Sequence, residues 1–147
     1  MSAQLDDALN QTGGQVAFQV ADAAMEPDEV RRWVEFVLGG GGLVLCGGEG
    51  GLPAALGLRA IEANYSGQIA PTAGFEGWFE PGEVESEWLV TGAGYALLRT
   101  VGAECVLLGA PRGKGWVAFC GRADPPPPFL IEAIRWLADR TGAAKAE

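Results

Sequence analysis

The sequence predicts an α/β fold, in which helices cover both faces of a mainly parallel β-sheet. Short apolar strands alternate with helical segments along the chain, and this order is typical of a parallel sheet with crossover helices. The stretch Gly39–Leu58, GGGGLVLCGGEGGLPAALGL, combines a continuous apolar strand with a glycine turn and a short helix. A strand without polar alternation is typical of one that is buried on both faces of a sheet.

The first half of the chain contains the clearest elements. Val16–Val20 is expected to be a strand, and residues 27–38 are expected to be an amphipathic helix that ends at the four glycines 39–42. Its apolar residues recur at the spacing of one helix face: Val30, Trp33, Val34, Val37 and Leu38. Leu43–Cys46 then gives a buried strand, and Leu52–Leu58 gives a short helix.

The second half is expected to hold several strands and a last helix. Residues 59–75 are expected to be a strand or an irregular segment, with Tyr65 and Ile69 facing inward, and residues 76–88 a surface loop or an edge strand. Two strands at 95–101 and 104–108 are expected to form a hairpin. A strand at 116–120 and a polyproline connector at 125–128 follow. The apolar stripe of the last helix is expected at Leu130, Ala133, Ile134 and Leu137.

Length and composition favour one domain. A chain of 147 residues is within the usual size of a single domain and can bury a core without disulfides. We expect a tail or short helix at 1–14, one α/β domain at 15–142 and a tail at 143–147. The polar, acidic N-terminus does not resemble a signal peptide, and no apolar run reaches about 18 residues. We therefore expect a cytoplasmic protein.

Charge and cysteine usage exclude several classes of function. The net charge of −9 comes from 19 acidic and 10 basic residues, so we expect no binding to nucleic acid or to an anionic membrane. Three cysteines without close spacing, in a chain without histidine, fit neither a disulfide framework nor a zinc site. We expect no metal and no cofactor.

Four consecutive segments resemble the nucleophile region of the class I glutamine amidotransferase-like superfamily: the amphipathic helix, the strand GGGGLVLC, the turn GGEGG and the helix LPAALGL. Cys46-Gly47-Gly48 matches the Cys-x-Gly turn of that superfamily. Three further segments resemble its non-amidotransferase branches, such as the ThuA-like proteins: Trp33–Leu45, Gly113–Gly121 and Ile131–Leu137. The resemblance covers about residues 25–58 and 108–140, and it implies a three-layer, flavodoxin-like fold.

The chain departs from this superfamily in ways that bear on function. The amidotransferases activate the cysteine with a later His and Glu, and the ThuA-like proteins carry histidines after both key strands, where this chain has Cys46 and Arg122. The N-terminus is short by one strand–helix unit, so we expect a reduced sheet or an edge that is open to a partner. The resemblance thus implies the scaffold of an active site without its catalytic residues.

The candidate ligand pocket consists of Cys46, Gly47, Gly48, Glu49 and Arg122, and we assign no catalytic residue. Cys46 has no general base, and a buried cysteine commonly acts as a small apolar residue. The turn 47–51 either cradles an anion with its N–H groups or has glycines for backbone fit, and we favour the second. Arg122 either holds a carboxylate or sugar hydroxyl, or pairs with Asp124.

A second candidate surface consists of aromatic residues among glutamates. Trp78, Phe79 and Trp88 are interleaved with five glutamates: Glu76, Glu80, Glu83, Glu85 and Glu87. These aromatic side chains either stack on a sugar or a partner protein, or cover the edge of the sheet.

We expect a non-catalytic amidotransferase-like domain that acts as an interaction or ligand-binding module, whose partner is a protein or a second copy of the chain. The alternative is a binding protein or enzyme for a small carbohydrate-like or acidic metabolite.

Overall fold

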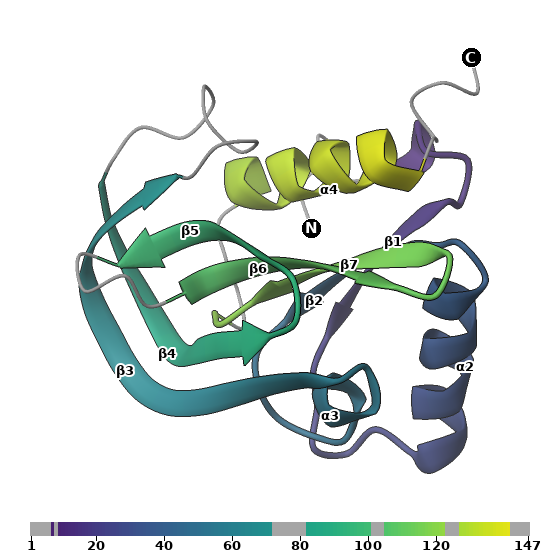
Figure 1. The fold of residues 1–147 in the computed structure, drawn as a ribbon, viewed down its shortest axis with the longest axis horizontal. Helices are drawn as coiled ribbons and strands as arrows, with labels where there is room; N and C mark the ends of the chain where they lie inside the picture. Colours follow the sequence, from purple (N-terminus) through teal and green to yellow (C-terminus); the bar gives the residue numbers. More distant parts are fainter. Residues whose placement is uncertain (1–6, 8, 72–81, 101–104, 123–126, 142–147) are drawn as a thin grey trace.

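A computed structural model describes residues 7, 9–71, 82–100, 105–122 and 127–141. The elements along the chain are β1 (Val16–Val20), α2 (Pro27–Leu38), β2 (Gly42–Cys46), α3 (Leu52–Ala55), β3 (Leu58–Pro71), β4 (Gly82–Gly92), β5 (Tyr95–Thr100), β6 (Cys105–Arg112), β7 (Gly115–Cys120) and α4 (Pro127–Thr141). Figure 1 shows the strands as one continuous, strongly bent sheet with helices on either side. The predicted α/β fold is confirmed.

The sheet has seven strands in the order β1-β2-β7-β6-β5-β3-β4. The strands β1, β2 and β7 are parallel to one another. The remaining neighbours, from β7 through β6, β5 and β3 to β4, pair antiparallel. The parallel pairing predicted from the sequence is therefore confined to three strands. Strands β3 to β6 extend the sheet by antiparallel pairing.

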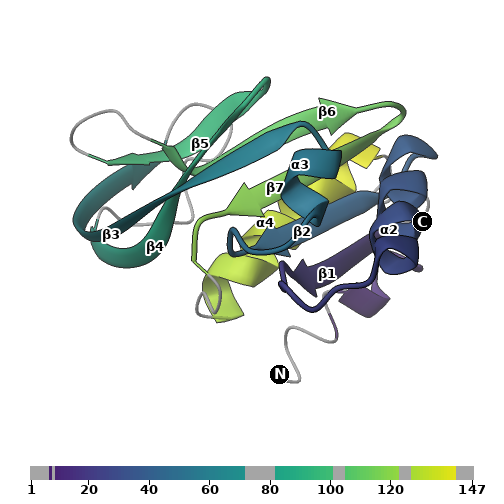
Figure 2. The ribbon, with the colours of Figure 1, turned by 90° about the horizontal axis from the view of Figure 1, so that it is seen from below.

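The three layers form because the central strands are apolar on both faces. Helix α4 covers one face of β1, β2 and β7, while α2 and α3 lie on the other (Figures 1 and 2). Val44 and Cys46 belong to the core on the α4 side, and Leu43 and Leu45 belong to the core on the side of α2 and α3. This alternation follows from the period of two in a strand.

Two expected helix boundaries are wrong. Helix α3 ends at Ala55 rather than at Leu58, because Gly57 has a φ of +71° and Leu58 already begins β3. Pro127 and Pro128 belong to α4 rather than to a polyproline connector, because proline is tolerated in the first helical turn, where its missing N–H has no intrahelical partner. Residues 125 and 126 lie outside the described residues.

The second half of the sheet is dominated by a long ribbon of β3 and β4. Its pairing shifts register between Glu62 and Tyr65, and such a bulge bends a ribbon locally. Strand β4 ends the sheet, so the edge-strand prediction is confirmed for residues 82–88, while residues 76–81 lie outside the described part. The predicted antiparallel pairing of the strands at 95–101 and 104–108 is confirmed by β5 and β6, although β6 continues to Arg112 instead of ending at residue 108 and residues 101–104 lie outside the described part.

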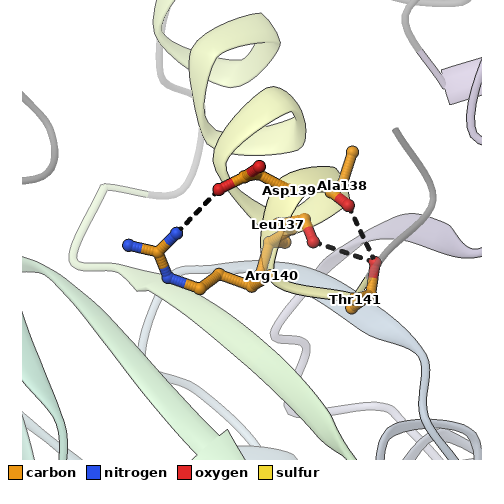
Figure 3. A network of polar contacts seen from close by, with 5 residues as sticks. All are labelled: Leu137, Ala138, Asp139, Arg140 and Thr141. Carbon is orange, nitrogen blue, oxygen red and sulfur yellow. Dashed lines mark hydrogen bonds and ion pairs between the residues drawn. The ribbon is translucent and has the colours of Figure 1, made fainter. Parts of the chain in front are cut away.

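Polar side chains in the C-terminal turn of α4 contact the helix backbone and one another (Figure 3). The Thr141 hydroxyl donates to the Leu137 carbonyl oxygen at 2.9 Å, one turn earlier in the same helix. Arg140 forms an ion pair with Asp139 and lies 4.6 Å from the ring centre of Trp136. These contacts hold the Trp136 ring at the sheet, where Trp116 meets it edge to face.

Candidate functional site

The carboxyl ends of the three parallel strands meet at one edge of the sheet. Val20, Cys46 and Cys120 are in register at the ends of β1, β2 and β7. The predicted residues Gly47, Gly48 and Glu49 follow Cys46 directly, and Arg122 lies two residues after Cys120. The structure therefore brings the five predicted site residues to the same edge. That they form a ligand pocket stays a prediction.

Cys46 faces the protein interior. Its side chain has 0% exposure and packs in the core beneath α4. A hydrogen bond with the thiol of Cys120, the burial of the group and the charge of Cys120 all raise the pKa of Cys46 well above that of an ordinary thiol. A thiol in such surroundings keeps its proton at neutral pH, whereas a nucleophilic cysteine reacts as the thiolate.

The glycines after Cys46 are required by backbone geometry and by close packing. Gly47 and Gly50 have φ values of +90° and +77°, which side chains rarely tolerate. A Cβ on Gly50 would overlap the carbonyl oxygen of Asp22, and one on Gly48 would lie 2.5 Å from the Cβ of Ala60. These contacts favour the backbone-fit interpretation of the turn. Anion binding by its N–H groups stays a prediction, and Glu49 is exposed beside it.

The ribbon of β3 and β4 covers this turn. A Cβ on Gly48 would also lie 2.9 Å from the indole ring of Trp88 in β4. The Trp88 backbone N–H donates to the Gly121 carbonyl oxygen at 3.1 Å, so the outer edge of β4 meets the residue that follows β7. Half-buried Trp88 therefore covers the edge of the sheet, which is one of the two alternatives stated for the aromatic residues. Trp78 and Phe79 lie outside the described residues.

Arg122 lies at the same edge of the sheet, at the carboxyl ends of β1, β2 and β7, which we call the covered edge because the ribbon of β3 and β4 packs against it. It is half-buried, and its backbone N–H approaches Cys120 Sγ at 3.4 Å. Its proposed partner Asp124 is outside the described residues.

Arg112 is the last residue of β6 and lies beside the start of β7, at the end of that strand opposite to Cys120. It has a structural role that the sequence does not reveal. Its guanidinium donates to the carbonyl oxygens of Leu56 and Gly57, after α3, and to that of Ala93 at 2.9 Å, between β4 and β5. It thereby connects the base of the β3–β4 ribbon to the end of β6. A sequence signal for this role is absent, because the three carbonyl groups come from residues 19 to 56 positions away.

Within the described ranges, no group of three or more His, Cys, Asp or Glu side chains is placed to hold a metal ion. Cys105 is half-buried at the start of β6, and its thiol donates to the Leu107 carbonyl oxygen at 3.1 Å. No helix of this part of the chain is long and apolar enough to cross a membrane.

No family model matches the chain, and no curated protein matches it. The β-galactosidase from Bacillus circulans sp. alkalophilus is similar in structure, with a TM-score of 0.65 and 17% identity over 95% of this chain and 26% of that one. A GH42 β-galactosidase from G. stearothermophilus gives 0.65 and 14% identity over 92% of this chain and 25% of that one. The cytoplasmic protein STM3548 from Salmonella typhimurium gives 0.62 and 12% identity over 93% of this chain and 76% of that one.

These likenesses define the class of fold. They agree with the α/β fold expected from the sequence. The chain spans about a quarter of the β-galactosidases that it matches, and at these identities the likeness concerns the fold alone.

Proposed function

We propose that this chain is a non-catalytic, amidotransferase-like domain that acts by binding a partner or a ligand. The observation that carries the proposal is the position of Cys46: at the strand end where the resembled enzymes have their nucleophile, its side chain has 0% exposure.

Covalent catalysis by a cysteine needs an accessible thiolate and a general base. The raised pKa of Cys46 opposes the first requirement. The whole sequence contains no histidine, which removes the usual base. The approach of a substrate to the Cys46 thiol is opposed as well, because Ala60 and Trp88 pack against the glycine turn that follows Cys46.

A binding role is supported by the way the fold occurs elsewhere. In the similar β-galactosidases the matching part is 26% and 25% of the chain, so the fold can form one part of a larger protein. Here the sheet ends in β1 and β4. The Trp88 N–H of β4 is paired with Gly121, whereas an edge strand such as β1 can pair with another chain. A protein partner or a second copy is therefore the proposed occupant, and the mass of the protein in solution tests for the second copy.

The alternative is a small-molecule site for a carbohydrate-like or acidic metabolite at the covered edge. It is favoured by Arg122, which lies half-buried beside Cys120. Thermal-shift screening against sugars and carboxylic acids tests it. A stabilisation that Arg122→Ala removes would support this alternative over the interaction module.

The main test compares the wild type with Cys46→Ser and with Cys105→Ser in glutaminase and esterase assays. Cys105 is the matched control, because it is also a free cysteine but packs against the core on the other face of the sheet, on the side of α2 and α3. We expect no turnover above that of a heat-denatured sample for any of the three proteins. A turnover that Cys46→Ser removes and Cys105→Ser preserves would overturn the proposal.

A further inference from the structure

Cys46 and Cys120 form a pair of thiols that the proposed function does not use. They are in register on the neighbouring parallel strands β2 and β7, which lie about 4.8 Å apart in a sheet. Both side chains point to the same face of the sheet, into the core beneath α4. Two sulfur atoms from separate parts of the sequence thus lie side by side at the carboxyl ends of the strands.

We propose that Cys46 and Cys120 bind one soft monovalent metal ion, such as Cu(I), between their two sulfur atoms. Thiolate sulfur selects Cu(I) over harder ions, and Cu(I) accepts two sulfur ligands in a linear arrangement. A tetrahedral zinc site needs further ligands. The sequence has no histidine, and the structure places no third metal-binding side chain with this pair among the residues that it describes.

Binding is a replacement of protons by the metal. Each thiol loses its proton to solvent as its sulfur–metal bond forms, so one ion replaces two protons and no atom changes its oxidation state. The resulting bis-thiolate complex carries one negative charge. The Arg122 backbone N–H approaches Cys120 Sγ at 3.4 Å, and hydrogen bonds of this kind from outside the ligand set stabilise a metal-bound ligand.

Entry is expected at the strand ends. Cys120 is 4% exposed, compared with 0% for Cys46, and Gly121 follows it directly. Cys120 is therefore the member of the pair that is nearer to solvent.

The test is competition for Cu(I) with the chelator bicinchoninate under anaerobic conditions. We expect the wild type and Cys105→Ser to remove one equivalent of Cu(I) from the chelator. Cys46→Ala and Cys120→Ala are expected to leave the Cu(I) with the chelator, while circular dichroism confirms that they are folded. The proposal fails if the wild type takes up no Cu(I), or if Cys105→Ser abolishes uptake.

A second measurement needs no variant, in case the alanine variants do not fold. X-ray absorption at the copper edge of the Cu(I)-loaded wild type counts the atoms bound to the metal. Two sulfur neighbours and no nitrogen or oxygen neighbour are expected. Three sulfurs, or any nitrogen or oxygen ligand, would overturn the two-cysteine site. Neither measurement depends on whether the domain binds a partner, so this inference fails or stands separately from the proposed function.

Discussion

The parallel and antiparallel halves of the sheet differ in what they contribute. Strands β1, β2 and β7, between α2 and α4, have the arrangement in which α/β proteins place ligands at the strand ends. The antiparallel ribbon of β3 and β4 packs against those ends through Ala60 and Trp88. In Figure 2 the ribbon projects beyond the helical layers before it turns back. The parallel half forms the edge at which the predicted site residues lie, and the antiparallel half packs against that edge.

The largest effect is expected from truncation in the parallel half. Leu45 in β2 has 0% exposure, so Leu45→Ala should lower the free energy of unfolding by about 2–5 kcal/mol through lost burial and a new cavity. Ile61→Ala in β3 is the control, because Ile61 is 51% exposed and its loss should cost under about 1 kcal/mol. Urea denaturation measures both. Equal losses would contradict the burial of Leu45 in the core.

A smaller effect is expected where the two halves meet. Gly48→Ala would place a Cβ 2.5 Å from Ala60 and 2.9 Å from the Trp88 ring, and overpacking of this kind costs about 1–3 kcal/mol. Gly51→Ala is the matched control in the same turn, because nothing lies within 4 Å of its added Cβ. We also expect the tryptophan fluorescence of Gly48→Ala to shift to the red as the ribbon is pushed outward. Unchanged fluorescence and stability would show that the ribbon does not cover the turn.

Arg112→Ala should weaken the base of the ribbon. It removes donors to the carbonyl oxygens of Leu56 and Ala93, and we expect a loss of about 1–2 kcal/mol, since the group is partly exposed and solvent replaces some of the hydrogen bonds. Arg31→Ala is the control, because Arg31 forms an exposed ion pair with Asp28 that is worth under about 1 kcal/mol. Thermal unfolding that ranks the two variants in the opposite order would contradict this role.

The smallest effect is a dependence of stability on alkaline pH. The pKa of Cys46 is higher in the folded protein than in the unfolded chain, so the folded state keeps a proton that the unfolded state loses. This contribution is fully present below the ordinary thiol pKa and decreases above it, by at most about 1.4 kcal/mol per pH unit. Urea denaturation between about pH 7 and pH 9.5 should show a shallower decrease for Cys46→Ala than for the wild type. Parallel curves would be inconsistent with a raised pKa.

The parallel half could be predicted from the sequence because its signals are local. The apolar run Leu43–Cys46 and the spacing of Val30, Val34 and Val37 identify a buried strand and an amphipathic helix without knowledge of the neighbours. The glycine turn is also a local signal, whereas the expected position of Arg122 near Cys46 goes with the resemblance to the amidotransferase-like superfamily.

The closing contacts could not be predicted, because they join distant residues. Gly48 meets Trp88 only through the antiparallel pairing and bend of β3 and β4. The contact of Cys46 with Cys120 requires β7 to lie next to β2, although four strands intervene in the chain. Short apolar segments indicate strands but not their neighbours, so neither contact leaves a signal in the sequence.

The central claim is that Cys46 is an interior residue rather than a nucleophile, and its alkylation in the native protein tests this claim most directly. Iodoacetamide at pH 7.5, followed by mass spectrometry of peptides, measures the rate at each cysteine. We predict that Cys46 stays unmodified in the native protein, that Cys105 reacts faster because it is half-buried, and that all three cysteines react in urea. Alkylation of native Cys46 as fast as, or faster than, that of Cys105 would contradict the account.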